Sequence, residues 1–450
     1  MRKKVLESSI LFISIVKWLS LASIAGIAVG VSTTVFLKVL ETGITFAMGF
    51  SHYYLFLPIA MAISVIIVKY FAPEAEGHGT EKIIEAVHRR SGKIKFSVIP
   101  VKLIATVITI SFGGSAGKEG PAAQIGAGLC SALSNLFKFD DMDRKKMVIC
   151  GISAGFAVVF GTPIAGAIFG VEVLFVGAML YDVLLPSFVA GIVGYQVSSA
   201  LGIKYFHEPL NFVPVFSSAL FIEVCVGGLF FGLCSLVFIE VLRFFENVSS
   251  RMKLNKIYKA IIGGSVLIAL SFVFSKDYFG LGLDTIKKAL EGESVNFGAF
   301  ILKMLFTSIT LSFGGSGGII TPIFFVGSTI GNIFGRMFGL DASLFSAIGM
   351  VSLLAGAANT PISASIMAVE LFGPQIGAYA AIACVISYLM TGHRSVYPSQ
   401  VLAIAKSTSI IVSKGQEIKG ISSVEFDVRR KSITGFISKG IKKIMKHKRL

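Results

Sequence analysis

Charged side chains are scarce in this sequence. Asp, Glu, Lys and Arg make up 15% of its 450 residues, hydrophobic residues make up 54%, and the mean hydropathy is +0.81. A signal peptide before a soluble domain cannot produce this balance, because long apolar runs recur along the whole chain. Examples are Leu19–Leu37, Leu55–Val68, Phe216–Val241 and Ala378–Met390. We therefore expect an all-α, multi-pass integral protein of the cell inner or plasma membrane.

Paired cysteines are also missing, and acidic residues are few. The five cysteines lie in or beside apolar segments without paired spacing, which excludes a disulfide framework and a zinc or redox motif. Lys and Arg outnumber Asp and Glu by 41 to 25, for a net charge of +16. The basic residues gather in short loops and at the termini, so they favour contacts with anionic lipid over a nucleic-acid partner. Both termini are expected to be cytoplasmic.

Two glycine-rich stretches interrupt apolar runs, at Thr109–Pro121 and at Thr310–Pro322. A loop inside the membrane leaves backbone N–H groups unpaired, which is tolerable only around a polar cavity or a bound anion. The first stretch contains Glu119 where the second has Ile320. An ionisable residue within a membrane segment is costly and marks a functional site by default. The interrupted helices are therefore the predicted site.

A second element is repeated in the same order. Thr162–Glu172 and Thr360–Glu370 both begin with Thr-Pro-Ile and end with glutamate. Such duplication is typical of transporters whose binding site lies at broken helices between two repeats. We expect the repeats at about residues 20–200 and 216–398.

The predicted membrane domain covers residues 1–400. Residues 401–450 are expected to form a short, basic cytoplasmic tail that is too short for a regulatory domain of ordinary size. Its last part, Arg429–Leu450, alternates apolar and basic residues, so it is either an amphipathic surface helix or a disordered tail.

Each glycine-rich loop precedes a proline and then a helix, near Pro121 and Pro322. A helix start presents free N–H groups and about half a positive charge, so it can hold an anion without a full cation. With the glycine-rich turn at residues 77–79, these starts form an anion cage of weak, dipolar ligands. The Glu119 carboxylate is itself an anion, so it can fill the empty site as a gate that opens on protonation or displacement. The alternative, an ion pair with Lys118, is geometrically poor because adjacent helical residues do not face each other.

Three segments together resemble the CLC chloride channel and transporter family. They are Gly-Lys-Glu-Gly-Pro at residues 117–121, Gly-Ile-Ile-Thr-Pro at residues 318–322, and Tyr397, within a resemblance that spans roughly residues 15–400. The resemblance implies two inverted repeats of many tilted and broken helices, and a homodimer with a separate ion path in each subunit. It also implies that Glu119 is the gate, that backbone amides hold a central anion, and that the Tyr397 hydroxyl donates to it. The anion-binding residues expected on this basis are Gly77, His78, Gly79, Gly117, Lys118, Gly120, Gly318, Ile319, Ile320 and Tyr397.

Three positions depart from the family pattern. His78 stands where a serine commonly contacts the anion: its imidazole can donate a hydrogen bond and adds charge when protonated, or it turns aside and leaves only backbone amides. Val173 stands where proton-exchanging members commonly have a glutamate that relays protons, and Glu172 matches the structural glutamate before it. Valine there is typical of channels, although some exchangers manage without the glutamate. Ile320 replaces the usual phenylalanine and is expected to change packing only.

These features favour CLC-type transport of chloride with channel-like or weakly proton-coupled conduction. Chloride/proton antiport is the first alternative, and fluoride or nitrate transport is the next because of His78. A passive receptor or scaffold gains nothing from a buried glutamate and paired broken helices. An intramembrane serine hydrolase is a remote alternative: Ser115 and Ser316 both fit G-x-S-x-G, with His78 or His393 as a base, but glycine-rich sequence meets this pattern easily. We expect no enzyme activity and no metal, nucleotide or organic cofactor, only chloride in the path.

Overall fold

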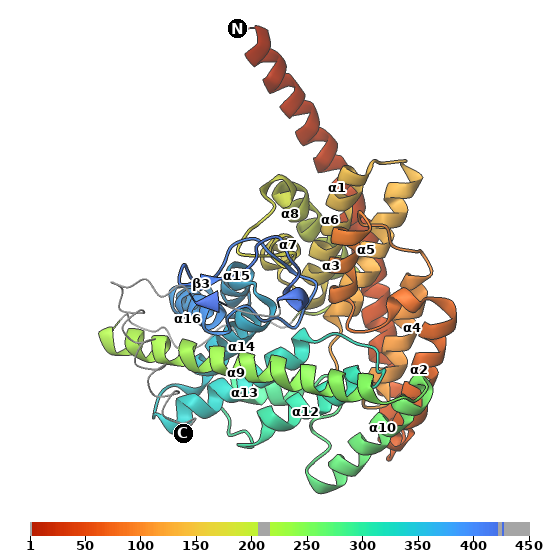
Figure 1. Cartoon of the computed structure of the whole chain (residues 1–450), viewed down its shortest axis with the longest axis vertical. Coiled ribbons are helices and arrows are strands. Elements are labelled where there is room, and N and C mark those ends of the chain that lie inside the picture. Colours follow the sequence, from red (N-terminus) through yellow and green to blue (C-terminus); the bar gives the residue numbers. More distant parts are fainter. Residues whose placement is uncertain (1, 206–216, 422–424, 427–450) are drawn as a thin grey trace.

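The computed structural model describes residues 2–205, 217–421 and 425–426. The described chain is mainly helical (Figure 1). In the first half the α-helices are α1 (Arg2–Met48), α2 (Leu57–Phe71), α3 (Thr80–Arg89), α4 (Val98–Ser111), α5 (Glu119–Leu136), α6 (Asp141–Phe160), α7 (Pro163–Glu172) and α8 (Leu184–Ala200). In the second half they are α9 (Ser218–Arg251), α10 (Lys256–Val273), α11 (Leu283–Leu290), α12 (Ala299–Ser312), α13 (Ile320–Met337), α14 (Ala342–Ala358), α15 (Pro361–Phe372) and α16 (Gly377–Met390). The short strands are β1 (Phe175–Val176), β2 (Val401–Leu402), β3 (Ile410–Ile411) and β4 (Glu425–Phe426).

The fold contains both long and short helices. Within the described residues, the segments long and apolar enough to cross a membrane are Leu6–Met48, Tyr53–Phe71, Tyr181–Ala200, Ser218–Arg251 and Lys256–Val273. Other apolar helices, including α4, α7, α12 and α15, are shorter. They end at the glycine-rich loops or begin at the Thr-Pro breaks, because glycine lets the chain turn and proline suits the first helical position. Helix ends are thereby placed inside the protein.

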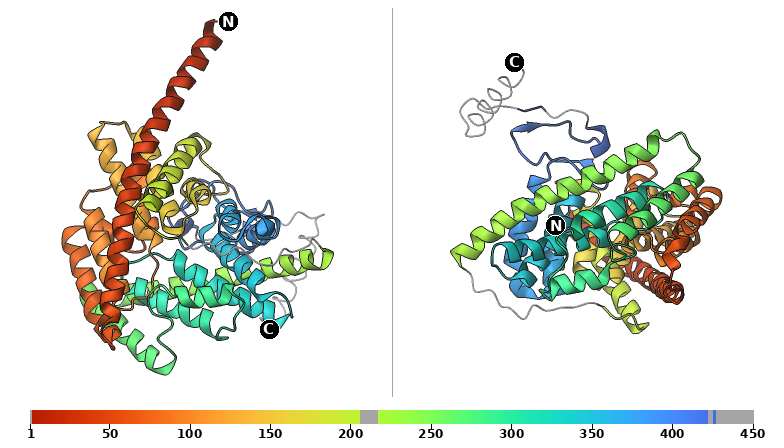
Figure 2. Two further views of the ribbon diagram at one scale, coloured as in Figure 1. Left: turned by 180° about the vertical axis from the view of Figure 1, so that it is seen from behind. Right: turned by 90° about the horizontal axis from the view of Figure 1, so that it is seen from below.

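The first helix packs through small residues and extends beyond the rest of the molecule. A Cβ on Gly26 would lie 2.8 Å from Ala190 O of α8, and a Cβ on Gly30 would lie 2.8 Å from Gly194 O. Both glycines therefore allow a close approach of two helix backbones, as a GxxxG pattern permits. The first turns of α1 project from the body in Figures 1 and 2 and expose apolar side chains such as Phe12.

The two halves correspond element by element. α4 and α12 both have 14 residues, and α5 and α13 both have 18. The Glu172 carboxylate accepts two backbone N–H groups in the first turn of α15 (3.0 and 2.8 Å), and Glu370 accepts two in the first turn of α7 (2.9 and 2.8 Å). Each carboxylate therefore stabilises the positive end of a helix in the other half. The predicted helical fold with two internal repeats is confirmed.

Each glycine-rich loop also forms a hydrogen bond with a helix of the other half. The Ser115 N–H donates to Thr310 Oγ1, and the Ser316 N–H donates to Thr109 Oγ1, both at 3.1 Å. All four side chains are buried. Threonine hydroxyls on α4 and α12 thus satisfy N–H groups of the opposite loop, which is how a break in these helices is accommodated without water.

The segment after α16 packs back onto the membrane domain. β2 pairs in parallel with β1, and Leu402 and Ile418 bury an apolar cluster with Val176. The predicted domain boundary after residue 400 therefore falls inside a packed segment that runs to residue 421, because these apolar side chains find a surface beside α7. The tail expected at residues 429–450 lies outside the described residues.

An ion pair fastens this C-terminal segment to α3. The Arg89 guanidinium donates two hydrogen bonds to the Glu417 carboxylate, at 2.6 and 2.8 Å. These bonds hold the pKa of the Glu417 carboxyl below its usual range. In the first turn of α3, the Glu81 carboxylate accepts bonds from the Ser399 N–H (3.0 and 3.2 Å) and hydroxyl (2.5 Å).

Candidate anion site

Glu119 begins α5, and its side chain reaches the start of α13. One carboxylate oxygen accepts a hydrogen bond from the Ile320 N–H at 2.5 Å, and the other accepts one from the Thr321 hydroxyl at 2.7 Å. Glu119 is only 1% exposed. None of the described ion pairs joins it to Lys118. The carboxylate therefore occupies the place where an anion would meet the N–H groups and the positive dipole end of α13.

Glycines make room for this side chain. A Cβ on Gly117 would lie 2.3 Å from a Glu119 carboxylate oxygen, and a Cβ on Gly318 would lie 2.2 Å from one. A Cβ on Gly120 would lie 2.1 Å from His78 O. The turn before α3 therefore contacts the start of α5, and the three predicted loops meet at one place.

Gly117 and Gly318 also bond to each other. The Gly117 N–H donates to Gly318 O at 2.7 Å, and the Gly318 N–H donates to Gly117 O at 2.6 Å. Their N–H groups are thus engaged by backbone and are not directed at an ion, which differs from the expectation for these two residues. The reason is the pairing of the two repeats: the loops face each other, and the nearest backbone groups satisfy one another.

His78 and Tyr397 are neighbours. Both are buried, and their ring centroids are 5.7 Å apart. The Tyr397 hydroxyl contacts the side chain of Thr80. His78 Nδ1 is buried with no hydrogen-bond partner among the described residues. A buried polar atom without a partner is costly, so this position suits a ligand that supplies one.

A buried lysine of α4 fixes the turn that carries His78. The Lys102 ammonium donates to Ala75 O at 3.1 Å and to Gly77 O at 2.5 Å. Gly77 and Gly79 have φ of +81° and +78°, in the region that favours glycine. Lys303 of α12 serves the corresponding turn before α11. The sequence analysis missed both lysines, although a lysine inside an apolar helix is the same kind of signal as Glu119.

The position at which proton-exchanging members of the family commonly have a glutamate is aliphatic and buried here. Val173 is fully buried, and its carbonyl accepts a hydrogen bond from Gln400 Nε2 at 2.8 Å. Gln400, also fully buried, donates to Ala358 O at 2.8 Å. Glu172 next to Val173 caps α15, which is a structural contact. No sequence pattern connected Gln400 with this position.

The two serines of the G-x-S-x-G patterns are held by threonines. Ser115 Oγ lies 3.0 Å from Thr307 Oγ1, and Ser316 Oγ lies 3.0 Å from Thr106 Oγ1. His393 Nε2 instead accepts a backbone N–H at 3.1 Å. A nucleophilic serine requires a base within hydrogen-bond reach, and the hydroxyl partners that the described residues provide to these two serines are threonines.

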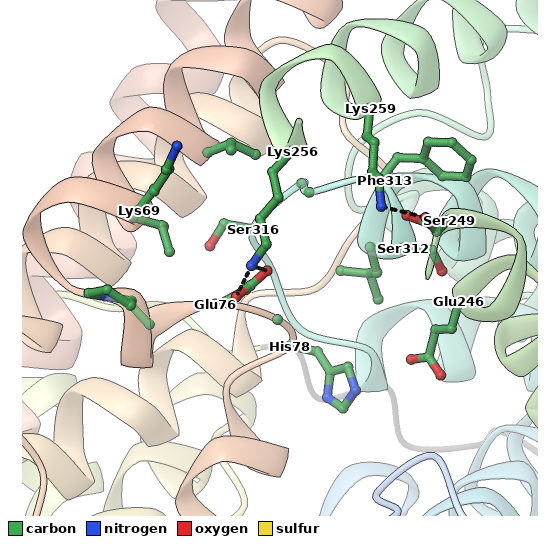
Figure 3. A pocket seen from close by; sticks show the side chains of 18 of the residues that line it. Lys69, Glu76, His78, Glu246, Ser249, Lys256, Lys259, Ser312, Phe313 and Ser316 are labelled. Carbon is green, nitrogen blue, oxygen red and sulfur yellow. Dashed lines mark hydrogen bonds and ion pairs between the residues drawn. The ribbon is translucent and has the colours of Figure 1, made fainter. Parts of the chain in front are cut away.

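A cavity of about 690 Å³ opens beside His78, and we call it the vestibule. Its walls come from α2, the turn before α3, the end of α9, the start of α10 and the glycine-rich loop after α12. Figure 3 shows Lys69, Lys256 and Lys259 around it, with His78 at its edge. Lys256 Nζ contacts both carboxylate oxygens of Glu76, at 2.6 and 2.7 Å. The vestibule is thus a charged approach to the three meeting loops.

A family model described as "Voltage gated chloride channel" matches residues 60–392. The chain belongs to this family, the CLC family. It is 35% identical over 402 residues to the chloride/fluoride channel protein of Pseudomonas syringae pv. tomato, with 86% of each chain covered. The fold of this CLC protein matches that of a CLC-type fluoride/proton antiporter with a TM-score of 0.82 and 29% identity, over 86% of this chain and 98% of that one.

A slow cyanobacterial Cl⁻/H⁺ antiporter shares the fold, with a TM-score of 0.74 at 20% identity over 83% of this chain and 94% of the other. Membership of the CLC family makes this chain a multi-pass membrane protein for anion transport.

Proposed function

We propose that this CLC protein moves fluoride across the membrane in exchange for protons, with Glu119 as the gate. Its Pseudomonas relative bears the name of a chloride/fluoride channel protein, and the antiporter that shares its fold at 29% identity exchanges fluoride and protons. Chloride is the second substrate of the proposal.

The observation that carries the proposal is the position of the Glu119 carboxylate on α13. The Ile320 N–H that the carboxylate accepts would equally bind a small anion, whereas the Thr321 hydroxyl helps to hold the carboxylate in this place. An arriving anion competes with the carboxylate for the backbone donor. A proton on the carboxylate removes its charge and weakens its hold, because hydrogen bonds to ionised acceptors are the stronger ones. One side chain thereby links anion binding to proton transfer.

The remaining donors suit fluoride. In the open path, the Ile319 and Ile320 N–H groups, the Tyr397 hydroxyl and the His78 imidazole would surround the ion. Fluoride is the smallest halide and the strongest hydrogen-bond acceptor among them, so it gains most from a buried imidazole whose Nδ1 has no protein partner. The backbone of Lys118 and Gly120 would contact the ion on the other side of the Glu119 carboxylate.

Uncoupled anion conduction is a second candidate, favoured by Val173. The valine side chain cannot carry a proton, and the carbonyl of the same residue accepts a hydrogen bond from the buried Gln400 side chain. Coupled exchange therefore requires that protons reach Glu119 by a route that does not use this position.

We also propose a homodimer with one path per subunit and both termini in the cytoplasm. Basic residues gather where α9 ends and α10 begins, at Arg251, Lys253 and Lys256, which favours the cytoplasmic side. The vestibule then opens to the cytoplasm.

The test uses purified protein in liposomes loaded with fluoride. A fluoride electrode follows the efflux, and a pH-sensitive dye inside follows protons. We expect fluoride leaving down its gradient to drive protons inward, and Glu119→Gln to abolish this proton movement. Glu240→Gln removes an exposed carboxylate that pairs with Arg394 and serves as the control. Fluoride efflux without proton movement would establish the second candidate, and the absence of both fluoride and chloride flux would refute both.

A further inference from the structure

One lysine of the vestibule forms an ion pair with a carboxylate from the opposite repeat. Lys256, at the first position of α10, reaches across to Glu76, which lies two residues before His78 (Figure 3). The other lysines nearby are arranged differently. Lys82 pairs with Glu85 at 3.1 Å, and Lys259 donates to the Ser249 carbonyl. Lys256 is therefore the vestibule lysine whose charge is masked by Glu76.

This ion pair is easily opened. The Lys256 side chain is 58% exposed and that of Glu76 is 49% exposed. Exposed ion pairs contribute little net stability because water solvates both charges well. Opening it also requires no backbone movement, because Lys102 anchors the turn through the carbonyls of Ala75 and Gly77 on either side of Glu76. Only the Glu76 side chain has to swing away.

The same arrangement recurs at the candidate anion site. There the Glu119 carboxylate occupies donors at the start of α13, and here the Glu76 carboxylate occupies an ammonium at the start of α10. In both places a carboxylate of the first repeat fills an anion position on a helix start of the second repeat. At the start of α10 the Lys256 ammonium adds a full positive charge, which can bind a passing anion as well as it binds a carboxylate.

We propose that Lys256 is an entry site for a small monovalent anion, occupied by the Glu76 carboxylate until an anion displaces it. This inference rests on the proposed anion transport and adds a capture step to it. Lys69 and Lys259 lie in the same cavity and raise the local anion concentration, whereas Glu81 and Glu246 oppose it. From Lys256 the anion passes Ser316 and His78 toward the three meeting loops.

The test is the dependence of exchange on anion concentration. Equal concentrations of fluoride are placed on both sides of the liposome, so that protein orientation does not matter, and unidirectional flux is measured with isotopically labelled fluoride. Glu76→Gln frees Lys256, and we expect its half-saturating concentration to fall about fivefold, the effect of one unit charge at about 4 Å in water. Lys256→Gln should raise this concentration by a similar factor. Maximal flux should change less than half-saturation in both.

The double variant and a control make the test specific. With Glu76→Gln in the Lys256→Gln background, half-saturation should fall by clearly less than it does when Lys256 is present, because only the long-range repulsion by the Glu76 charge is then removed. Glu240→Gln opens an ion pair of similar exposure outside the vestibule and should leave half-saturation unchanged. The inference is overturned if Glu76→Gln behaves like Glu240→Gln, or if its effect is undiminished without Lys256. Loss of flux in the unmodified protein would instead overturn the proposed function, and the inference with it.

Discussion

The substitution Thr321→Val tests how tightly the gate is held. The Thr321 hydroxyl donates one of the two bonds from α13 to the Glu119 carboxylate, at 2.7 Å, and valine has almost the same shape. Thr321 is 2% exposed, so water does not replace the lost bond. The Ile320 N–H bond remains. The substitution therefore weakens the binding of the Glu119 carboxylate at the start of α13 but leaves one of its two hydrogen bonds.

The magnitude follows from one hydrogen bond to an ionised acceptor. Such a bond contributes roughly 1.5–3 kcal/mol, and about 1.4 kcal/mol corresponds to a factor of ten in an equilibrium constant. Because the carboxylate and the anion compete for the same place, we expect the half-saturating fluoride concentration to fall about tenfold at least. The assay is unidirectional flux of labelled fluoride between liposome compartments of equal composition.

Two comparisons isolate the bond. Thr329→Val changes another buried threonine of α13, whose hydroxyl bonds only carbonyls of its own helix, and it should leave half-saturation unchanged. In a Glu119→Gln background, Thr321→Val should have little effect because the charged acceptor is gone. If Thr321→Val raises the half-saturating concentration instead, the hydroxyl binds the anion rather than the gate, and the competition argument is wrong.

Three further outcomes are expected. Glu172→Gln and Glu370→Gln should each lower unfolding stability in detergent by a similar amount, about 1–2 kcal/mol, because each carboxylate caps a helix of the other repeat; clearly unequal losses would contradict this symmetry. Because Arg89 lowers the folded-state pKa of Glu417, their pair stabilises the C-terminal segment above the unfolded pKa of about 4.3 and loses this effect as the pH falls through the folded value. Hydrogen exchange across acidic pH should therefore show loss of protection in residues 399–421, and Glu417→Gln should remove that pH dependence. His78→Ser should shift the flux ratio from fluoride toward chloride, whereas an unchanged ratio would show that the imidazole does not contact the ion.

Much of the site was predictable because membrane insertion penalises polar groups locally. Glu119 and the glycine-rich loops stand out inside apolar sequence, and so they marked the place of the candidate site, while the Thr-Pro breaks marked the repeats. The same rule applied to Lys102 would have identified the residue that holds the His78 turn. That lysine was missed because it lies in an otherwise regular helix, away from any glycine-rich motif.

The sequence by itself determined the class of protein, the two repeats and the buried carboxyl of the candidate anion site, because apolar runs, repeated breaks and an isolated carboxyl are properties of the chain order. The tertiary structure decided which partner each polar group takes. Gly117 and Gly318 bond to each other, Glu119 reaches Thr321, and Glu76 crosses to Lys256. All of these contacts join residues from opposite repeats, and no local pattern specifies them, since they exist only after the two halves have packed face to face.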